Sequence, residues 1–300
     1  MRIALVTYHA EGIYARQLVE DDQLIDFLAS KDLNLQKVVW NDPDVLWHKF
    51  DLLLIKSPWD YFDHIDAFYQ WLDQIDKLGI QALNPVEVLR WNADKRYLNT
   101  IAAAGLKIVP SLFPEQGTKL QLKAYFDSFN CQELVVKPVV SGGSKHTFRI
   151  NPENMSAMQI TLDALSATEA FIVQPFLPEI EKEGEWSFIF FGGRFSHALI
   201  KRAKAGDFRV QESHGGSVHV QAQVTAEAIE VAATYVRTFA KDCLYARVDG
   251  VFIDGEFHLI ELELIEPFLF LNTMPDSYEN YYLALKSFML PSSSSNPRSY

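Results

Sequence analysis

The feature that most restricts the fold of this chain is a pair of apolar segments that carry acidic side chains in their interior. Residues 246–267 read ARVDGVFIDGEFHLIELELIEP, which has the pattern of a β-hairpin with a tight turn at Asp254-Gly255. Strands this apolar are normally buried, and a buried ionised carboxylate is costly unless it is paired with a cation or bound to a metal. The hairpin therefore predicts a buried sheet with a charged site on it.

Two turns are compatible with this hairpin, and they place Asp249 on opposite faces. Glu261 and Glu263 share a face because side chains alternate along a strand. A two-residue loop would put Asp249 on the other face, whereas a three-residue loop with Gly255 left-handed puts Arg247 opposite Glu261 and Asp249 beside them. We expect the three-residue loop, because it gathers the charged residues on one face and leaves an apolar face for the core.

Carboxylates gathered on one face indicate divalent cations. Asp249, Glu261 and Glu263 would each have a raised pKa unless cations neutralise them. Oxygen ligands without histidine or thiolate select Mg²⁺ or Mn²⁺, which also bind phosphate oxygens. The alternative is a solvated strand face in which Arg247 and Glu261 form an ordinary cross-strand pair.

The rest of the chain divides into regions of different pattern. Residues 1–84 alternate strands with helices, which predicts a small parallel α/β domain. Residues 85–175 predict a linker helix and a small antiparallel sheet with helices on one face, and residues 176–290 a larger lobe that contains the hairpin. Residues 291–300, PSSSSNPRSY, are low in complexity and are expected to form a disordered tail. The strands expected in the first region are 2–8, 35–40 and 51–57, and its helices are 18–30 and 61–78.

Two lysines and a glycine-rich loop precede the hairpin at positions that suit a phosphate ligand. Lys95 stands at the start of a helix, where the helix dipole disfavours a cation unless both face one anion. Lys137 interrupts the apolar strand LVVKPVV and needs an anionic partner. Directly after it, Ser141-Gly142-Gly143-Ser144 has the composition of a loop that covers phosphate. Together they favour a triphosphate, although a solvated Lys95 and a simple glycine turn are alternatives.

Composition argues against several classes of function. The chain has 300 residues, a net charge of −12 and no basic run, which makes nucleic acid and anionic membranes poor candidates as partners. No apolar run approaches about 18 residues, and the N-terminus lacks the features of a signal peptide. Cys131 and Cys243 follow no metal or redox spacing. We therefore expect a cytoplasmic protein that binds neither nucleic acid nor membrane.

The motifs follow one another in the order of a known superfamily. They are DKRYL with AAAG, VVKP before the glycine-rich loop, VQPFLPEIEKEGE, GDFR, and ARVDG with ELELIEP. Over roughly residues 84–275 the chain resembles the ATP-grasp superfamily, in particular its carboxylate–amine ligases. These include bacterial glutathione synthetase, D-alanine–D-alanine ligase and the glutamate ligase that modifies a ribosomal protein. The stretch KSPWDY is similar to one in the ring-closing ligase of cycloserine biosynthesis. The arginine of that motif is missing here, because the stretch begins with Lys56. The resemblance implies an N-terminal α/β domain followed by a two-lobed ATP-grasp fold.

The resemblance also implies how the nucleotide is bound. Lys95 and Lys137 would hold the α- and β-phosphates of ATP, and the Ser141–Ser144 loop would close over the γ-phosphate. Glu185 would bind the ribose hydroxyls, with Glu179 as a second candidate. Adenine would bond to the backbone near Gln174, Phe176 and Leu177.

Metal ions and the reacting groups have implied partners as well. Asp249, Glu261 and Glu263 match the ligands of two Mg²⁺ ions, with Glu261 bridging them. Arg247 and Arg209 match arginines that contact the transferred phosphoryl group and the substrate carboxylate. Candidates for substrate recognition are Arg16, Trp59, Asp60, Tyr61 and His214.

The implied reaction is ATP-dependent amide formation through an acylphosphate, with release of ADP and phosphate. The expected partners are a small amino-acid-like carboxylate, an amine and, in a homodimer, a second copy of the chain. An ATP-grasp kinase and a non-catalytic nucleotide-binding regulator are the alternatives. The sequence leaves open which substrates are joined and whether the product is a ring.

Overall fold

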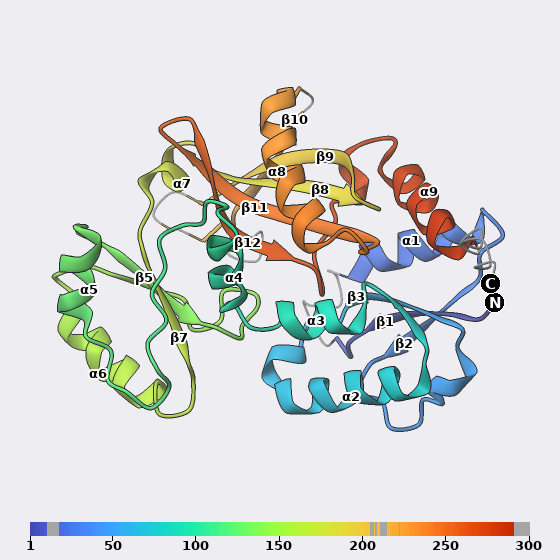
Figure 1. The fold of residues 1–300 in the computed structure, drawn as a ribbon, viewed down its shortest axis with the longest axis horizontal. Helices are drawn as coiled ribbons and strands as arrows, with labels where there is room; N and C mark the ends of the chain where they lie inside the picture. The colour runs from blue at the N-terminus through green and yellow to red at the C-terminus, as the bar shows by residue number, and fades with distance from the viewer. Residues whose placement is uncertain (11–17, 205–206, 208, 211–214, 222, 291–300) are drawn as a thin grey trace, which may run out of the picture.

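Three β-sheets organise the protein in the computed structural model, which describes residues 1–10, 18–204, 207, 209–210, 215–221 and 223–290 (Figure 1). The parallel sheet of the N-terminal region lies at the lower right of Figure 1, the small sheet at the left and the five-stranded sheet at the top. None of the described helices is long and apolar enough to cross a membrane. The mixed α/β architecture predicted from the sequence is confirmed.

The N-terminal sheet is parallel, with the strand order β2-β1-β3-β4. Alternate residues of its strands face opposite sides, so one side packs on α1 and the other on α2. Helix α2 is followed by Gly79, whose φ of 64° forms the left-handed cap that glycine favours. The elements are β1 (Ile3–Thr7), α1 (Val19–Ala29), β2 (Leu35–Val39), η2 (Trp47–Lys49), β3 (Leu52–Ser57), η3 (Tyr61–Asp63), α2 (Ile65–Leu78) and β4 (Gln81–Leu83).

A small antiparallel sheet with the order β6-β5-β7 follows two short helices. Leu122 of α5 and Leu162 of α6 pack with Leu134 and Val136 of its central strand, and Figure 1 shows both helices on one side of it. The predicted sheet with helices on one face is confirmed. The elements are α3 (Val86–Asn92), α4 (Tyr97–Ala103), α5 (Leu122–Phe129), β5 (Leu134–Pro138), β6 (Phe148–Ile150), α6 (Met155–Leu165), β7 (Phe171–Pro175) and α7 (Pro178–Lys182).

The five-stranded sheet is antiparallel, with the order β10-β9-β8-β11-β12. Helix α8 covers one of its faces and begins at Thr225, whose hydroxyl accepts a hydrogen bond from the Ala228 amide at 3.2 Å. The elements are β8 (Glu185–Phe191), β9 (Arg194–Arg202), β10 (Ser217–Gln221), α8 (Ala226–Phe239), β11 (Tyr245–Ile253), β12 (Glu256–Glu263), η5 (Leu271–Thr273) and α9 (Ser277–Met289).

The turn of the β11–β12 hairpin differs from the prediction. Ile253 pairs with Glu256, so the loop has two residues, and the predicted three-residue loop is wrong. Asp254 and Gly255 both have positive φ, 50° and 80°, which is the conformation of a two-residue hairpin turn whose twist matches that of the strands.

A bulge restores the charged face that the sequence predicts. The register shifts between Asp249 and Gly250, which leaves Ile260 as an extra residue on β12. Beyond the bulge, Asp249 lies opposite Glu261, and Arg247 lies opposite Glu263 rather than Glu261. A β-carbon at position 250 would lie 2.3 Å from the Phe257 ring and 2.6 Å from the His258 carbonyl oxygen, so only glycine fits there.

A buried ion pair joins the N-terminal sheet to the segment that follows β12. The ammonium of Lys56 lies 3.0 Å from Glu20 Oε1 and 3.4 Å from Asp21 Oδ1, and its side chain is fully buried. The carboxylate of Glu20 also accepts hydrogen bonds from the amides of Leu269 and Leu271, each at 2.9 Å. Chain segments almost 250 residues apart are therefore held together by one carboxylate.

Replacing Lys56 by methionine should destabilise the protein strongly. It leaves the buried carboxylates of Glu20 and Asp21 without the cation that they share, which costs about 3–5 kcal/mol of unfolding free energy. Urea denaturation measures this loss. The matched control is Lys37→Met, because Lys37 pairs with Asp22 at 2.7 Å on the surface and should contribute less than about 1 kcal/mol. Equal losses in the two variants would contradict the prediction.

Candidate active site

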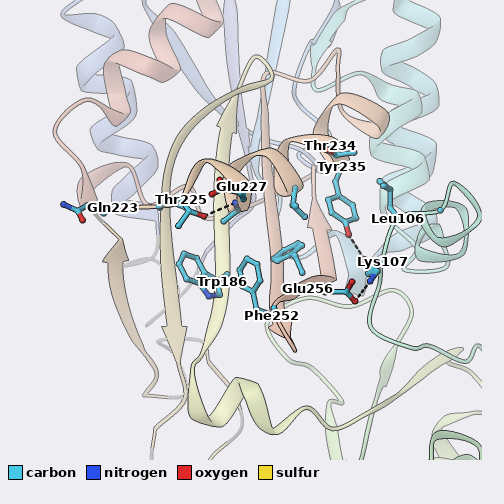
Figure 2. Close-up of a pocket in the computed structure, with 16 residues that line it drawn as sticks. Leu106, Lys107, Trp186, Gln223, Thr225, Glu227, Thr234, Tyr235, Phe252 and Glu256 are labelled. Atoms are coloured by element: carbon cyan, nitrogen blue, oxygen red, sulfur yellow. Dashed lines mark hydrogen bonds and ion pairs between the residues drawn. The ribbon is translucent and has the colours of Figure 1, made fainter.

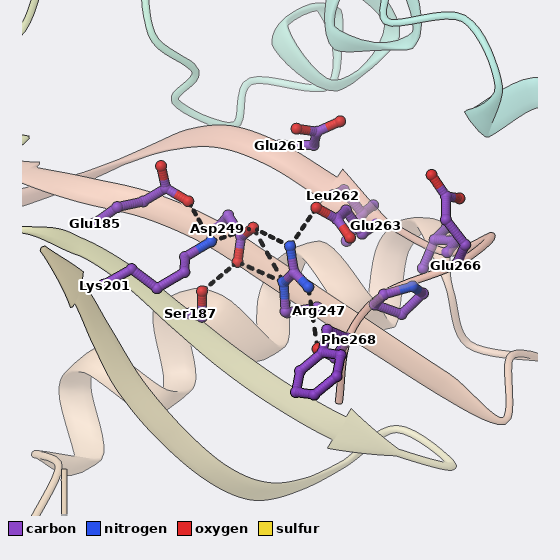
Figure 3. A network of polar contacts seen from close by, with 12 residues as sticks. Glu185, Ser187, Lys201, Arg247, Asp249, Glu261, Leu262, Glu263, Glu266 and Phe268 are labelled. Carbon is purple, nitrogen blue, oxygen red and sulfur yellow. Dashed lines mark hydrogen bonds and ion pairs between the residues drawn. The ribbon is translucent and has the colours of Figure 1, made fainter. Parts of the chain in front are cut away.

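A network of ion pairs occupies the face of the five-stranded sheet that α8 does not cover (Figure 3). At its centre is Asp249, which is 2% exposed. Its Oδ1 accepts a hydrogen bond from Ser187 Oγ at 2.6 Å, and its Oδ2 accepts bonds from Lys201 at 3.0 Å and from Arg247 Nη2 at 2.9 Å. Burial raises the pKa of Asp249, but Arg247 and Lys201 lower it more, so that the net pKa lies well below the usual range.

Lys201 links two of the predicted site residues. Its ammonium lies 2.5 Å from Glu185 and 3.0 Å from Asp249, and it is 7% exposed. Neither Lys201 nor Ser187 is among the residues predicted from the sequence. A signal for Lys201 was present, because the strand HALIKR places a lysine in an apolar run as LVVKPVV does for Lys137.

Arg247 connects the network to Glu263 and to the chain beyond β12. Its Nη2 donates to Glu263 Oε1, and its Nη1 donates to the carbonyl of Phe268 at 3.0 Å. Burial raises the pKa of Glu263 to about 7, against the opposing effect of the Arg247 guanidinium. The proton on Glu263 therefore exchanges close to neutral pH.

The two lysines that are predicted to bind phosphate lie near Glu261. Lys95 donates to the carbonyl of Ser141 at 2.7 Å and lies 3.1 Å from Glu261 Oε1. The ammonium of Lys137 makes no hydrogen bond or ion pair with another described residue. Its pKa is lowered, by burial first and also by Lys95, while Glu261 raises it. Lys95, Lys137 and Glu261 are thus brought together, as the sequence predicts.

The Ser141–Ser144 loop lies against the N-terminal region. A β-carbon on Gly142 would come within 2.5 Å of the Phe62 ring, so loop backbone and ring are in contact. Lys145, the next residue after the loop, forms an ion pair with Asp63. The hydroxyl of Ser141 donates to the carbonyl of Pro138 at 3.0 Å. The loop therefore bridges the small sheet and the 3₁₀ helix η3.

The residues predicted to surround adenine are partly committed to other bonds. The amide of Phe176 donates to the carbonyl of Glu133 at 2.9 Å, and the Gln174 side chain donates to Ser111 Oγ at 2.9 Å. The ring of Phe176 lies 3.8 Å from the guanidinium carbon of Arg149. Leu177 is the residue that precedes α7.

The residues predicted to contact the substrate lie in different surroundings, and some of them lie outside the described residues. Arg209 pairs with Asp207 at 2.8 Å, and among the described residues no hydrogen bond or ion pair joins it to Arg247. Asp60 accepts a hydrogen bond from the Trp40 indole N–H at 2.6 Å. Trp59 donates to the carbonyl of Glu266 at 2.8 Å. Two further candidates, Arg16 and His214, lie outside the described residues.

The predicted metal ligands suit Mg²⁺ in kind but are not arranged as a preformed site. In the described residues no group of three Asp, Glu, His or Cys side chains is placed to hold a metal ion. Glu261 and Glu263 each form an ion pair through Oε1, which leaves Oε2 available to coordinate a cation. Both oxygens of Asp249 are already bonded. Glu261 and Glu263 therefore fit oxygen coordination as they stand, whereas Asp249 must first exchange partners.

A separate cavity of about 650 Å³ lies on the opposite face of the five-stranded sheet, beneath α8 (Figure 2). Trp186, Tyr235 and Phe252 line it, and the ion pair between Lys107 and Glu256 lies at its edge. Trp186 stands between Glu185 and Ser187 on β8, so alternation directs it away from the charged network. None of the predicted site residues lines this cavity.

Comparison with known proteins identifies relatives over nearly the whole chain. The family described as the prokaryotic glutathione synthetase ATP-grasp domain matches residues 114–268, and the N-terminal domain of D-cycloserine synthetase DcsG matches residues 3–84. The cycloserine biosynthesis protein DcsG of Streptomyces lavendulae is 26% identical over 272 residues, which cover 84% of this chain and 88% of that protein.

Solved structures also resemble this chain over nearly its whole length. The crystal structure of D-cycloserine synthetase DcsG superimposes with a TM-score of 0.79 at 26% identity and covers 96% of this chain and 99% of that one. D-alanine–D-alanine ligase from Bacillus anthracis has a TM-score of 0.70 at 16% identity, with 96% of each chain covered. At that identity the second likeness concerns the fold alone.

The predicted role of Glu263 as an Mg²⁺ ligand implies that the affinity for Mg²⁺ should rise with pH, because the ion would compete with the proton on Glu263. With a pKa of about 7, this one group raises the affinity about tenfold from about pH 6 to about pH 8. Titration of Mg²⁺ with a fluorescent ATP analogue measures this. Glu263→Gln removes the titrating group and keeps the pH dependence of the nucleotide itself. Identical slopes in both proteins would contradict the assignment.

Proposed function

The chain belongs to the prokaryotic glutathione synthetase ATP-grasp family, and from that premise we propose that its charged face joins a small carboxylate to an amine at the expense of ATP. The observation that supports this most directly is the approach of Lys95 to Glu261, with Lys137 beside them. Lysines from the small-sheet side thereby meet carboxylates from the five-stranded sheet. This is the charge pattern that a metal-bound triphosphate requires.

Several residues would hold the nucleotide. Lys95 and Lys137 would bind its phosphates, and Lys137 is suited to this because its ammonium has no other partner in the described residues. Lys95 would exchange its bond to Glu261 for one to phosphate. The Ser141–Ser144 loop would cover the γ-phosphate and exclude water, because acylphosphates hydrolyse. Glu185 would bind the ribose, and the backbone near Gln174 and Leu177 the adenine.

Glu261 and Glu263 would hold Mg²⁺ first, and Asp249 would join them after giving up a bond to Lys201 or Arg247. We propose two ions, with Glu261 shared between them; bound Mg²⁺ would neutralise phosphate oxygens and so reduce their repulsion of an incoming carboxylate. Once released from Asp249, the guanidinium of Arg247, which also donates to Glu263 and Phe268, would have a donor available for the transferred phosphoryl group. An arginine in such a role contributes about 10³-fold or more to the rate.

The reaction would proceed in two displacements. A carboxylate oxygen of the substrate forms a bond to the γ-phosphorus while the bond to the bridging oxygen of ADP breaks, which produces an acylphosphate. The amine nitrogen then bonds to the acyl carbon, phosphate leaves with the carbon–oxygen electron pair, and the nitrogen loses a proton. Neither displacement needs a nucleophilic side chain from the protein. The relative named as a D-cycloserine synthetase is named for a small molecule, which supports small-molecule substrates, and we propose that these are amino-acid-like.

ADP release from Mg²⁺-ATP in the presence of amino acids and dipeptides tests the ligase assignment. Glu261→Gln should lower turnover at least about 100-fold, because it removes a charge that faces both Lys95 and the metal. The matched control is Glu256→Gln at the exposed start of β12. Unchanged turnover in Glu261→Gln would contradict the site. A phosphorylated product without an amide would identify a kinase instead.

Gly142→Ala tests the loop separately. The added methyl group would collide with the Phe62 ring at 2.5 Å and displace the loop, so the KM for ATP should rise about fivefold or more. Removing the obstacle in the double variant Gly142→Ala/Phe62→Ala should restore the KM. A single variant that binds ATP normally would show that the loop does not cover the nucleotide in this position.

A further inference from the structure

The cavity beneath α8 is lined by residues that the proposed reaction does not use. Its volume of about 650 Å³ lies in the range that small-molecule sites occupy. It is enclosed by α8, the segment that follows α4 and the turn of the β11–β12 hairpin (Figure 2). Because the sheet separates it from the charged face, a molecule bound here would touch neither the nucleotide nor the substrate.

Aromatic rings form one wall of this cavity. Trp186 lies parallel to Phe188 with 5.4 Å between the ring centroids, and Phe252 meets it at an interplanar angle of 81°. Phe257 lies 5.4 Å from Phe252 and 5.9 Å from Tyr235, centroid to centroid. Trp186 and Phe252 are half-buried, so these rings remain partly open to a ligand. Such a wall binds flat apolar molecules and attracts cations to its ring faces.

The charged groups around the cavity favour a cation. Lys107 and Glu256 lie at its edge and neutralise one another in an ion pair. Glu227, in the first turn of α8, also lines the cavity and makes no hydrogen bond or ion pair with another described residue. The hydroxyl of Tyr235 already donates to the carbonyl of Lys107 at 2.6 Å. Among the described residues, Glu227 is thus an acid of this cavity without a cationic partner, so an ammonium group suits the cavity and a carboxylate does not.

The same wall supports the bulge of the β11–β12 hairpin. Phe257 is 4% exposed, and its ring is so close to Gly250 that a β-carbon there would lie 2.3 Å away. The register shift beside Gly250 places Asp249 opposite Glu261. Trp186 stands on β8, the strand that pairs with β11 and supplies a hydroxyl hydrogen bond to Asp249. A ligand that fills the cavity would hold both rings in place and so stabilise the arrangement of the acids on the other face.

We propose that the cavity beneath α8 is an effector site for a small molecule with an aromatic body and a protonated amine, and that filling it strengthens the binding of the magnesium nucleotide on the other face of the sheet. The binding of the amine stands on the cavity itself, whereas its effect on the nucleotide rests on the proposed function. The two binding events are thermodynamically linked, so each must strengthen the other by the same factor.

Tryptamine and indole-3-propionate are matched probes, because they share the indole ring and differ in the sign of their charge. Isothermal titration calorimetry of the full chain should show a Kd of about 1 mM or below for tryptamine, and one at least about tenfold higher for indole-3-propionate. Saturating tryptamine should lower the Kd of a fluorescent ATP analogue with Mg²⁺ about fivefold or more. The saturating analogue should lower the Kd of tryptamine by the same factor.

Variants on the exposed side of α8 test where the amine binds. Val231 lines the cavity and is 40% exposed, so Val231→Trp should obstruct the cavity without disturbing the core, and tryptamine binding should be lost. Glu227→Gln should raise the Kd of tryptamine about fivefold or more, because it removes the charge that faces the ammonium group. The matched control is Glu230→Gln on the same helix, which pairs with Arg237 outside the cavity and should leave this Kd unchanged.

Equal affinity for the two probes, tryptamine binding that survives in Val231→Trp, or a nucleotide affinity that does not respond to bound tryptamine would overturn the proposal. Weaker nucleotide binding in the presence of tryptamine would place the amine in the nucleotide site and overturn it as well. So would a homodimer, measured by sedimentation velocity, that dissociates in Val231→Trp, because a second copy of the chain would then occupy the cavity. A wild type that binds no nucleotide would refute the proposed function, and the amine site would then stand or fall on the two probes and Val231→Trp.

Discussion

The bonds of Arg247 and Lys201 to Asp249 are the interaction on which the rest of the site depends. A carboxylate that is 2% exposed can remain ionised only because two cations and a hydroxyl surround it. Those cations in turn hold Glu185 and Glu263 in place. A metal-bound nucleotide brings both positive and negative charge, so it can replace each of these pairs by an equivalent one. The network is therefore suited to exchange its partners without leaving a buried charge alone.

The same chain segment connects this network to the N-terminal region. Arg247 holds the carbonyl of Phe268, and Glu20 holds the amides of Leu269 and Leu271. Glu20 is itself fixed by the buried Lys56. The N-terminal sheet and Arg247 are therefore connected through residues 268–271. On the other side, Phe62 and Asp63 touch the loop that we propose to cover the phosphates. The network around Arg247 and the loop that we propose to cover the phosphates are thus both in contact with the N-terminal region.

The local sequence pattern was sufficient to predict the helices, the strands and most of the charged residues of the site. It was not sufficient to predict the strand register or which charged residues pair with one another. The run LVVKPVV exposed Lys137, and the alternation of ELELIEP placed Glu261 and Glu263 on one face. The turn was predicted wrongly, because the extra residue is a bulge at Ile260 rather than part of the loop. That bulge depends on the contact of Gly250 with Phe257 across the hairpin, which a strand pattern does not encode. Partners such as Lys201 come from other strands, and only the sheet order brings them together.

An excess of acid in a site built for an anionic nucleotide needs a physical reason. The chain as a whole carries a net charge of −12, so ATP gains nothing from long-range attraction and must rely on the local lysines. An additional carboxylate at position 266 weakens that local field. Such a residue is unfavourable for nucleotide binding and, with its raised pKa, unfavourable in isolation. The raised pKa of Glu266 lessens that effect, because a protonated carboxyl group does not repel phosphate.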